Sequence, residues 1–545
     1  MMKLIITIFI LYTFLLDKNF ALDAESYEVY IEELSHNEKF LDEYTKWSLE
    51  LFSQSDYLYG NSHAAFPCSI EKSTDNISIP TSVHTLRPSD IKCVAAIGDS
   101  LTTGVAAHAI TPIGLLMENQ GISWSVGGDY TYSKIFSLPN ILKQYNPQLT
   151  GFSTKVSAMF SNNQNATNNR LNVAKSWDRS SEMFHQAELL IDRLKDKKLC
   201  DWDNDWKVIT LFAGTHDLCN FCEDSNLNKH TPEQYVNYIR ATLDKLYNAS
   251  IPRTLINLVL VLDVRSVKDL SNDNYVCQVL HKKICPCAAF PTVEQAKTLD
   301  NYITRYHQSL FHLIASERYE GRDDFSVVIQ PFMAKTKLLY KDNHKIDFSY
   351  FAPDCFHFSG KGHSVAALSL WNNMLEPVGG KKWSWHIGES LKCPTKEYPY
   401  IFTSKNSAKA LNELKHTTMS QTTNRVSTIS SDTTTSDINS TSHHHHHKHK
   451  NSKSILYSNK MKFIIITGLL FIIIMILTIS IVRRRKVRVF IPGNERHGFN
   501  GVDNSQYHDD NDEVEIWSRT NTKSNYFEKN KTTKSHGTRV FLNST

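Results

Sequence analysis

The chain has 545 residues, a formal net charge of +4 at pH 7 and 41% hydrophobic residues. That length is too great for one compact domain with short tails, so we expect several regions. The nearly balanced charge gives no indication of a nucleic-acid partner.

The first region, residues 1–21, is typical of a secretory signal peptide. Lys3 precedes an apolar run that is too short to span a bilayer, and Ala21 is the expected last residue before cleavage. Residues 22–85 follow as an N-terminal lead segment. Its apolar spacing predicts a helix from about Tyr30 to Ser53.

Residues 86–391 are expected to form the folded domain, because short apolar runs alternate there with amphipathic segments. The predicted strands are Cys93–Ile97, Val208–Phe212, Leu255–Leu262 and Val327–Ile329. The predicted helices are Glu182–Lys195, Pro232–Tyr247, Val293–Arg318 and Lys361–Met374. Strands that alternate with helices predict an α/β domain with a mainly parallel sheet. In such sheets the chemistry gathers at the carboxyl ends of the strands.

Residues 392–460 are rich in Ser, Thr and His, which predicts a flexible stalk without a core. We interpret its run of five histidines from His443 as a solvated stretch rather than a designed metal site. Residues 461–482 contain the uncharged run Phe463–Val482, which is long enough for a membrane-spanning helix. An Arg-rich stretch opens the tail, residues 483–545. With the signal peptide, this predicts a type I cell-membrane protein whose domain lies outside the cell.

All ten cysteines lie in the part of the chain that we expect outside the cell. An even number in that compartment predicts disulfides, whose pairing a single sequence does not determine. Zinc is the alternative at two short cysteine pairs, although no paired histidine spacing accompanies them: Cys219-x-x-Cys222 and Cys285-Pro-Cys287. Glycosylation sequons also suit an extracellular face, and they lie at Asn76, Asn165 and Asn248.

The stretch VAAIGDSLTTGVAA runs from a predicted strand into a turn that carries Ser100. A serine hydroxyl becomes a nucleophile when a histidine, itself held by a carboxylate, takes its proton. The later segment YFAPDCFHFSGKGHS has Asp354 and His357 three positions apart, so one loop can present both. Ser100 and the segment AGTHD both follow predicted strands and can share one site. The competing interpretation is a helix-capping Asp and a surface His.

Several long segments of the chain resemble GDSL-type (SGNH) lipases and, within that superfamily, the membrane-associated phospholipase B group. In chain order they are SVHTLRPSDIKCVAAIGDSLTTG, GISWSVGGD, LPNILKQYNPQLTGFST, LNVA, DWKVITLFAGTHDLC and SYFAPDCFHFSGKGHSVAALSLWNNMLEPVGGK. The resemblance implies a three-layer α/β/α SGNH-hydrolase (flavodoxin-like) domain beside a single transmembrane helix. It also implies that Ser100 is the nucleophile, His357 the base and then the acid, and Asp354 its orienting carboxylate. Such enzymes need no metal or cofactor.

Two positions depart from the pattern of that family. The block Gly-x-Asn-Asp, whose Asn donates to the oxyanion, reads GTHD here, so His216 replaces the Asn. A second block of that family has a glycine five residues after an asparagine. If Asn172 is that asparagine, Trp177 stands at the position of the glycine. An imidazole N–H can still donate and the Trp177 backbone N–H is kept, but the conformational freedom of glycine is lost. Losing one oxyanion donor typically costs about 10²–10³ in turnover.

From these observations we expect a membrane-anchored serine esterase that acts on phospholipid or lysophospholipid through an acyl-enzyme. The apolar stretch FSLPNIL and the tether favour a lipid substrate. Three alternatives stay open: an impaired hydrolase scaffold that binds lipid or glycan, an esterase for small or carbohydrate esters, and an adhesive stalked protein. The sequence does not determine the acyl position, the head-group preference or the oligomeric state.

Overall fold

The computed structural model describes residues 26–60, 65–70, 78–159, 166–223 and 228–413. The predicted signal peptide, membrane span and cytosolic tail lie outside these residues, as does most of the predicted stalk. The prediction of a stalk without a core is wrong for residues 392–413, because Ile401 and Phe402 are buried there and their N–H groups donate to the carbonyls of Leu86 and Met374. Among the helices within the described ranges, none is long and apolar enough to cross a membrane.

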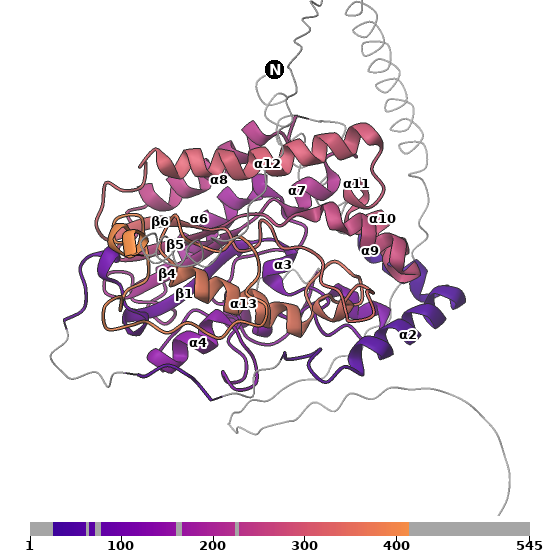
Figure 1. The fold of residues 1–545 in the computed structure, drawn as a ribbon, viewed down its shortest axis with the longest axis horizontal. Helices are drawn as coiled ribbons and strands as arrows, with labels where there is room; N and C mark the ends of the chain where they lie inside the picture. The colour runs from indigo at the N-terminus through magenta and orange to yellow at the C-terminus, as the bar shows by residue number, and fades with distance from the viewer. Residues whose placement is uncertain (1–25, 61–64, 71–77, 160–165, 224–227, 414–545) are drawn as a thin grey trace, which may run out of the picture. The chain divides into compact units, whose positions relative to one another are not determined.

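A parallel four-stranded sheet forms the centre of the domain (Figure 1). Its strands, in spatial order, are β1 (Ile91–Gly98), β4 (Trp206–Phe212), β5 (Thr254–Val259) and β6 (Phe325–Gln330). Every residue of β4, β5 and β6 is buried, as parallel sheets covered on both faces require. The prediction of an α/β domain with a mainly parallel sheet is confirmed, although the strand predicted over Leu255–Leu262 ends at Val259.

Helices cover both faces of this sheet, so the domain has three layers (Figure 1). One face carries α6 (Met183–Leu194), α8 (Pro232–Asn248) and α12 (Val293–Ala315). The other carries α4 (Leu138–Tyr145) and α13 (Gly360–Met374). Shorter elements complete the order: β2 (Met117–Glu118), β3 (Ser157–Ala158), α3 (Ser100–Thr103), α5 (Ala166–Asn169), α7 (Thr215–Asn220), α9 (Val267–Asp273), α10 (Tyr275–Ile284) and α11 (Pro286–Ala289).

The N-terminal lead segment is not the single helix predicted from about Tyr30 to Ser53. Residues 26–35 are helical, and a second helix, α2, covers Glu38–Phe52. The break falls at Asn37, whose side chain accepts a hydrogen bond from the Phe40 N–H and so caps α2. Buried side chains of the lead segment, among them Phe40 and Trp47, belong to the same hydrophobic cluster as residues of β1.

All ten cysteines lie in the described part of the chain, and they form five disulfides. The pairs are Cys68–Cys393, Cys93–Cys200, Cys219–Cys285, Cys222–Cys287 and Cys277–Cys355. The zinc alternative is therefore wrong, because the four cysteines it needs are oxidised and only a thiolate serves as the metal ligand. The same reasoning applies where Asp205 lies close to Cys93 and Cys200.

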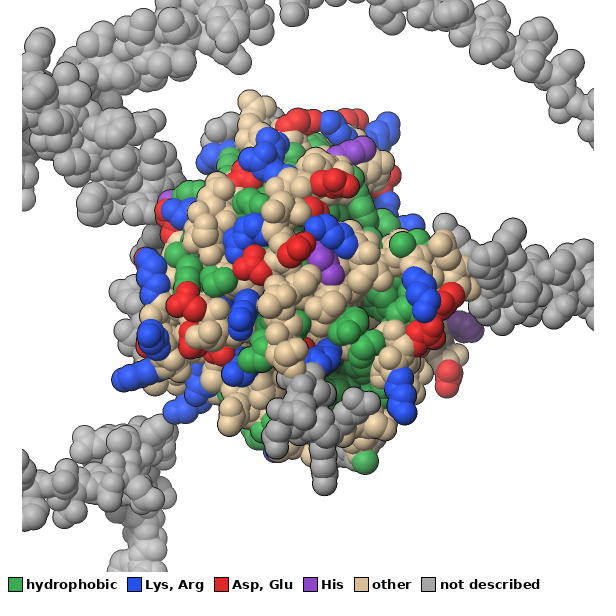
Figure 2. All heavy atoms as spheres, turned by 90° about the vertical axis from the view of Figure 1, so that its left-hand side faces the viewer, with side chains coloured by type: hydrophobic (Ala, Val, Ile, Leu, Met, Phe, Trp, Pro, Cys, Tyr) green, Lys and Arg blue, Asp and Glu red, His purple; other side chains and the backbone are tan. Residues whose placement is uncertain are grey.

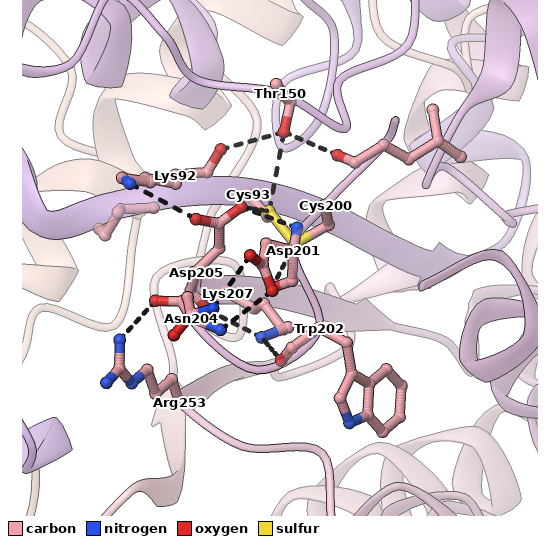
Figure 3. The surroundings of a disulfide bond; sticks show 12 residues. Lys92, Cys93, Thr150, Cys200, Asp201, Trp202, Asn204, Asp205, Lys207 and Arg253 are labelled. Atoms are coloured by element: carbon pink, nitrogen blue, oxygen red, sulfur yellow. Dashed lines mark hydrogen bonds and ion pairs between the residues drawn. A yellow bond between two sulfur atoms is a disulfide. The ribbon is translucent and has the colours of Figure 1, made fainter. Parts of the chain in front are cut away.

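A buried lysine organises the loop that the Cys93–Cys200 disulfide joins to β1 (Figure 3). The Lys207 ammonium donates to the carbonyl oxygens of Trp202 at 2.6 Å, Asp205 at 2.7 Å and Pro252 at 3.2 Å. Burial lowers the pKa of Lys207 to about 8, and the nearby Asp205 offsets part of that shift. The ammonium therefore satisfies the Trp202 and Asp205 carbonyls, and it shares the Pro252 carbonyl with the Thr254 hydroxyl, which donates to that oxygen at 3.1 Å.

Replacing Lys207 with methionine keeps the length of the side chain but removes the ammonium that donates to the Trp202 and Asp205 carbonyls, while the Pro252 carbonyl keeps the Thr254 hydroxyl. We expect Lys207→Met to lower the free energy of unfolding by about 2–4 kcal/mol, measured by denaturant titration. The matched control is Lys92→Met, because that half-exposed amine only pairs with Asp205 at 3.6 Å. Its expected cost is below about 1 kcal/mol, and equal costs for the two variants would contradict this role of Lys207.

Candidate active site

The turn after β1 presents Ser100 at the carboxyl edge of the sheet. Asp99 caps the short helix α3 by accepting the Leu101 N–H at 3.0 Å. A Cβ on Gly98 would lie 2.4 Å from Thr102 Oγ1 and 2.9 Å from the carbonyl oxygen of Phe212. A side chain does not fit at Gly98, which explains why a glycine ends the strand.

Three of the predicted site residues, far apart in sequence, form one row of hydrogen bonds. His357 Nε2 lies 2.8 Å from Ser100 Oγ, and His357 Nδ1 lies 2.6 Å from Asp354 Oδ2. Asp354 is fully buried and His357 is 5% exposed, whereas Ser100 is more accessible. This geometry suits transfer of the serine proton to an imidazole that a carboxylate holds in one tautomer.

The Asp354 carboxylate stays charged although it is buried. Burial alone raises its pKa, but the nearby His357 and the N–H groups of Phe356 and His357 outweigh burial and hold the pKa below its usual value. Both N–H groups donate to Asp354 Oδ1 at 3.0 Å. The opposite oxygen is thereby left for the imidazole.

Trp177 occupies a backbone conformation that favours glycine. Its φ is +70°, and it is the third residue of a turn in which the Asp178 N–H donates to the Lys175 carbonyl at 3.3 Å. Turns of type II favour glycine at that position. Within the described residues, the N–H groups of Trp177 and Ser100 have no hydrogen-bond acceptor. Both residues line one small pocket together with His357.

His216 lies in the same pocket, in the first turn of α7 directly after β4. Its ring packs edge-on against the Trp177 indole, with 5.1 Å between the centroids. Burial lowers the pKa of His216 to about 3, so the imidazole is neutral and keeps one N–H donor. The full lining of the pocket is Ser100, Trp177, Thr215, His216, Ile284, Phe356 and His357.

Two buried carboxylates hold the segment that carries Trp177: Glu118, which the sequence did not mark, and Asp217, which the sequence marked only as the last residue of the GTHD block. Glu118 accepts the Ser176 hydroxyl at 2.5 Å, and Asp217 accepts both the N–H and the hydroxyl of Ser180 at 2.8 Å. Burial raises the pKa of Glu118, and the bond from Ser176 offsets part of that rise. The sequence does not show which groups these carboxylates bind, because Ser176 and Ser180 become their neighbours only in the folded chain.

Gln186 of α6 is a further residue that sequence reasoning missed. Its amide pairs with both backbone groups of Gly98 at 2.9 Å and also donates to Asp178 at 2.7 Å. It therefore links the end of β1 to the turn of Trp177. Ile284 and Phe356, which line the pocket, carried no sequence signal either, since apolar residues are common throughout the chain.

Comparison with known proteins identifies the family of the chain. A family model described as GDSL-like Lipase/Acylhydrolase matches residues 94–370, and the chain belongs to that family. The chain is 39% identical over 340 residues to the human protein named "Phospholipase B1, membrane-associated", with 61% of this chain and 23% of that protein covered. The mouse protein of the same name is 38% identical over 340 residues, covering 61% and 22%. The chain thus spans less than a quarter of the length of these relatives.

Two substitutions of Trp177 distinguish the effect of its strained backbone on stability from the effect of its indole on the size of the pocket. We expect Trp177→Gly to be more stable than Trp177→Ala by about 1 kcal/mol, because only glycine adopts a positive φ without strain. Thermal unfolding of the two variants measures the difference. Equal stability would contradict the left-handed conformation at this position. Both variants remove the indole from the pocket, so both should turn over bulky esters faster than the unaltered protein.

Substitution of His216 tests whether its side chain donates to the oxyanion. We expect His216→Ala to lower kcat by about 10²–10³, because the donor is lost, and His216→Asn to retain most of the activity. The low pKa of His216 keeps the imidazole neutral throughout pH 5–8. His216→Asn should therefore leave the midpoint of the acid limb of the pH–rate profile in place. A shift of that midpoint would show that His216 titrates in this range.

Proposed function

We propose that the chain hydrolyses acyl ester bonds of phospholipids and lysophospholipids through an acyl-enzyme on Ser100. The observation that carries the proposal is the row of hydrogen bonds from Asp354 through His357 to Ser100, with the neutral His216 beside it. Membership of a lipase and acylhydrolase family supports ester hydrolysis. The name of the relatives supports the choice of phospholipid.

In the proposed reaction, Ser100 Oγ attacks the ester carbonyl carbon while its proton passes to His357 Nε2. The negative charge on the carbonyl oxygen is stabilised by the N–H groups of Ser100 and Trp177 and by the His216 imidazole. Collapse breaks the ester bond, and the proton on His357 passes to the departing glycerol oxygen. Water, deprotonated by His357, then attacks the carbonyl carbon of the acyl-serine. The bond from Ser100 Oγ to the acyl carbon breaks, His357 returns the proton to Ser100 Oγ, and a fatty acid is released.

The proposal includes a membrane tether, with the catalytic domain outside the cell. The uncharged run Phe463–Val482 and the basic residues after it support the tether. Complete pairing of the cysteines supports an oxidising compartment. Asn248, the last residue of α8, offers an exposed glycosylation sequon. A tethered esterase would meet its lipid substrate at a bilayer surface.

A second candidate is a binding protein on an impaired hydrolase scaffold. It is favoured by Trp177, whose indole packs against Tyr27 at 4.9 Å and His216 at 5.1 Å where the family pattern has a glycine. On that interpretation the indole fills the space that an ester would need. The row of hydrogen bonds through Ser100 favours the enzyme instead, because binding alone has no use for it.

Covalent labelling of Ser100 distinguishes the two candidates. We expect the full-length chain to react with a fluorophosphonate probe, because His357 activates the Ser100 hydroxyl. Ser100→Ala should abolish labelling. If the unaltered chain stays unlabelled and His216→Asn or Trp177→Gly becomes labelled, the impaired scaffold is correct.

The substrate class is tested with the same full-length chain on diacyl phospholipid, lysophospholipid and a short-chain acetate ester. We expect release of fatty acid from both lipids, and none from Ser100→Ala. Hydrolysis of the acetate alone would contradict the lipid assignment while leaving the esterase chemistry intact.

A further inference from the structure

The loop that carries Asp354 and His357 is tightly folded on itself. The Ala352 N–H donates to the His357 carbonyl at 2.7 Å, and the Cys355 N–H donates to the Ala352 carbonyl at 2.8 Å. Cys355, between Asp354 and His357, has a φ of +60°. Some carbonyls of this loop receive no N–H from within the loop. Where such carbonyls are buried, they need donors from elsewhere in the chain.

Three carbonyls of this loop receive those donors from other parts of the chain. The bonds are Tyr57 hydroxyl to Phe351 at 3.0 Å, Trp47 Nε1 to Pro353 at 3.1 Å, and His281 Nε2 to Asp354 at 2.9 Å. Because a carbonyl only accepts, the His281 proton is on Nε2, and Nδ1 accepts the hydroxyl of Ser271 at 2.6 Å. The disulfide Cys277–Cys355 joins the same loop covalently to α10, the helix of His281.

We propose that Trp47 and Tyr57 of the N-terminal lead segment, together with His281, are positioning residues for Asp354 and His357. The inference rests on the proposed esterase function. Trp47 and Tyr57 precede residue 94, where the family match begins, so part of the support of the Asp354–His357 loop lies outside the matched region. None of the three side chains lines the pocket, so they act through the loop.

The physical reason is the short reach of the catalytic hydrogen bonds. His357 must stay 2.8 Å from Ser100 Oγ while Asp354 stays 2.6 Å from the imidazole. A displacement of about 1 Å in such a row costs on the order of 10²-fold in rate. Trp47 and His281 bind the carbonyls of Pro353 and Asp354, at the very start of the Asp-x-x-His segment, so they restrict its movement directly.

The test compares two buried indoles that each donate to one proline carbonyl. Trp47→Phe removes the donor of Pro353, whereas Trp206→Phe removes the donor of Pro80, which receives its bond at 2.9 Å from the first residue of β4. Trp206 lies at the opposite end of the sheet from Ser100. Both changes keep an aromatic ring in a buried site, so both should lower thermal stability.

For the full-length chain we expect Trp47→Phe to lower kcat about tenfold with KM within twofold, at temperatures where each variant is folded. Tyr57→Phe should act in the same direction, and Trp206→Phe should keep kcat within twofold. The bridging proton on His357 Nδ1 provides a second readout, identified by its loss in Asp354→Asn. Its downfield NMR resonance should move or broaden in Trp47→Phe and stay unchanged in Trp206→Phe.

The outcomes keep the two proposals apart. If the unaltered chain neither hydrolyses esters nor labels, the proposed function fails, and the NMR resonance alone decides the positioning role. If the unaltered chain is active but Trp47→Phe matches Trp206→Phe in kcat and in the resonance, Trp47 is merely structural and this inference is overturned.

Discussion

The candidate site depends on the parallel pairing of β1 with β4. In that register Gly98 lies beside Phe212, at the same edge of the sheet. Ser100 lies two residues after Gly98, and His216 lies four residues after Phe212. The pairing of the two strands therefore brings Ser100 and His216 to one pocket. The close packing of Gly98 against the carbonyl of Phe212 leaves no room for a side chain there. A shift in this register would separate the serine from the imidazole N–H.

The Asp354–His357 loop depends on a wider set of contacts than the sheet provides. Side chains from the lead segment and α10 bind its carbonyls, and the Cys277–Cys355 disulfide joins it to α10. Hydrogen bonds within the loop do not reach those carbonyls, so side chains from the surrounding chain supply their donors. This arrangement makes residues before the family match part of the same folded unit as Ser100.

The two departures from the family pattern are physically linked. The Trp177 ring packs on the His216 ring, and both lie in the pocket of Ser100. Trp177 keeps the left-handed backbone of a glycine at a cost of about 1–3 kcal/mol. Buried carboxylates on either side hold its turn, through Ser176 and Ser180, and so sustain that conformation. The backbone N–H of Trp177 and a side-chain N–H at His216 are thus kept, while the indole occupies space that a glycine would leave open.

The sequence by itself determined the α/β class, the four strands and the main helices, because periodic apolar patterns reflect local geometry. It also marked Ser100, Asp354, His357, His216 and Trp177 as candidate site residues, through motif letters and a family resemblance. Only the tertiary structure decided the five disulfide pairs and the roles of Glu118, Gln186 and Trp47. Those features rest on contacts between residues far apart in the chain, which local patterns do not encode.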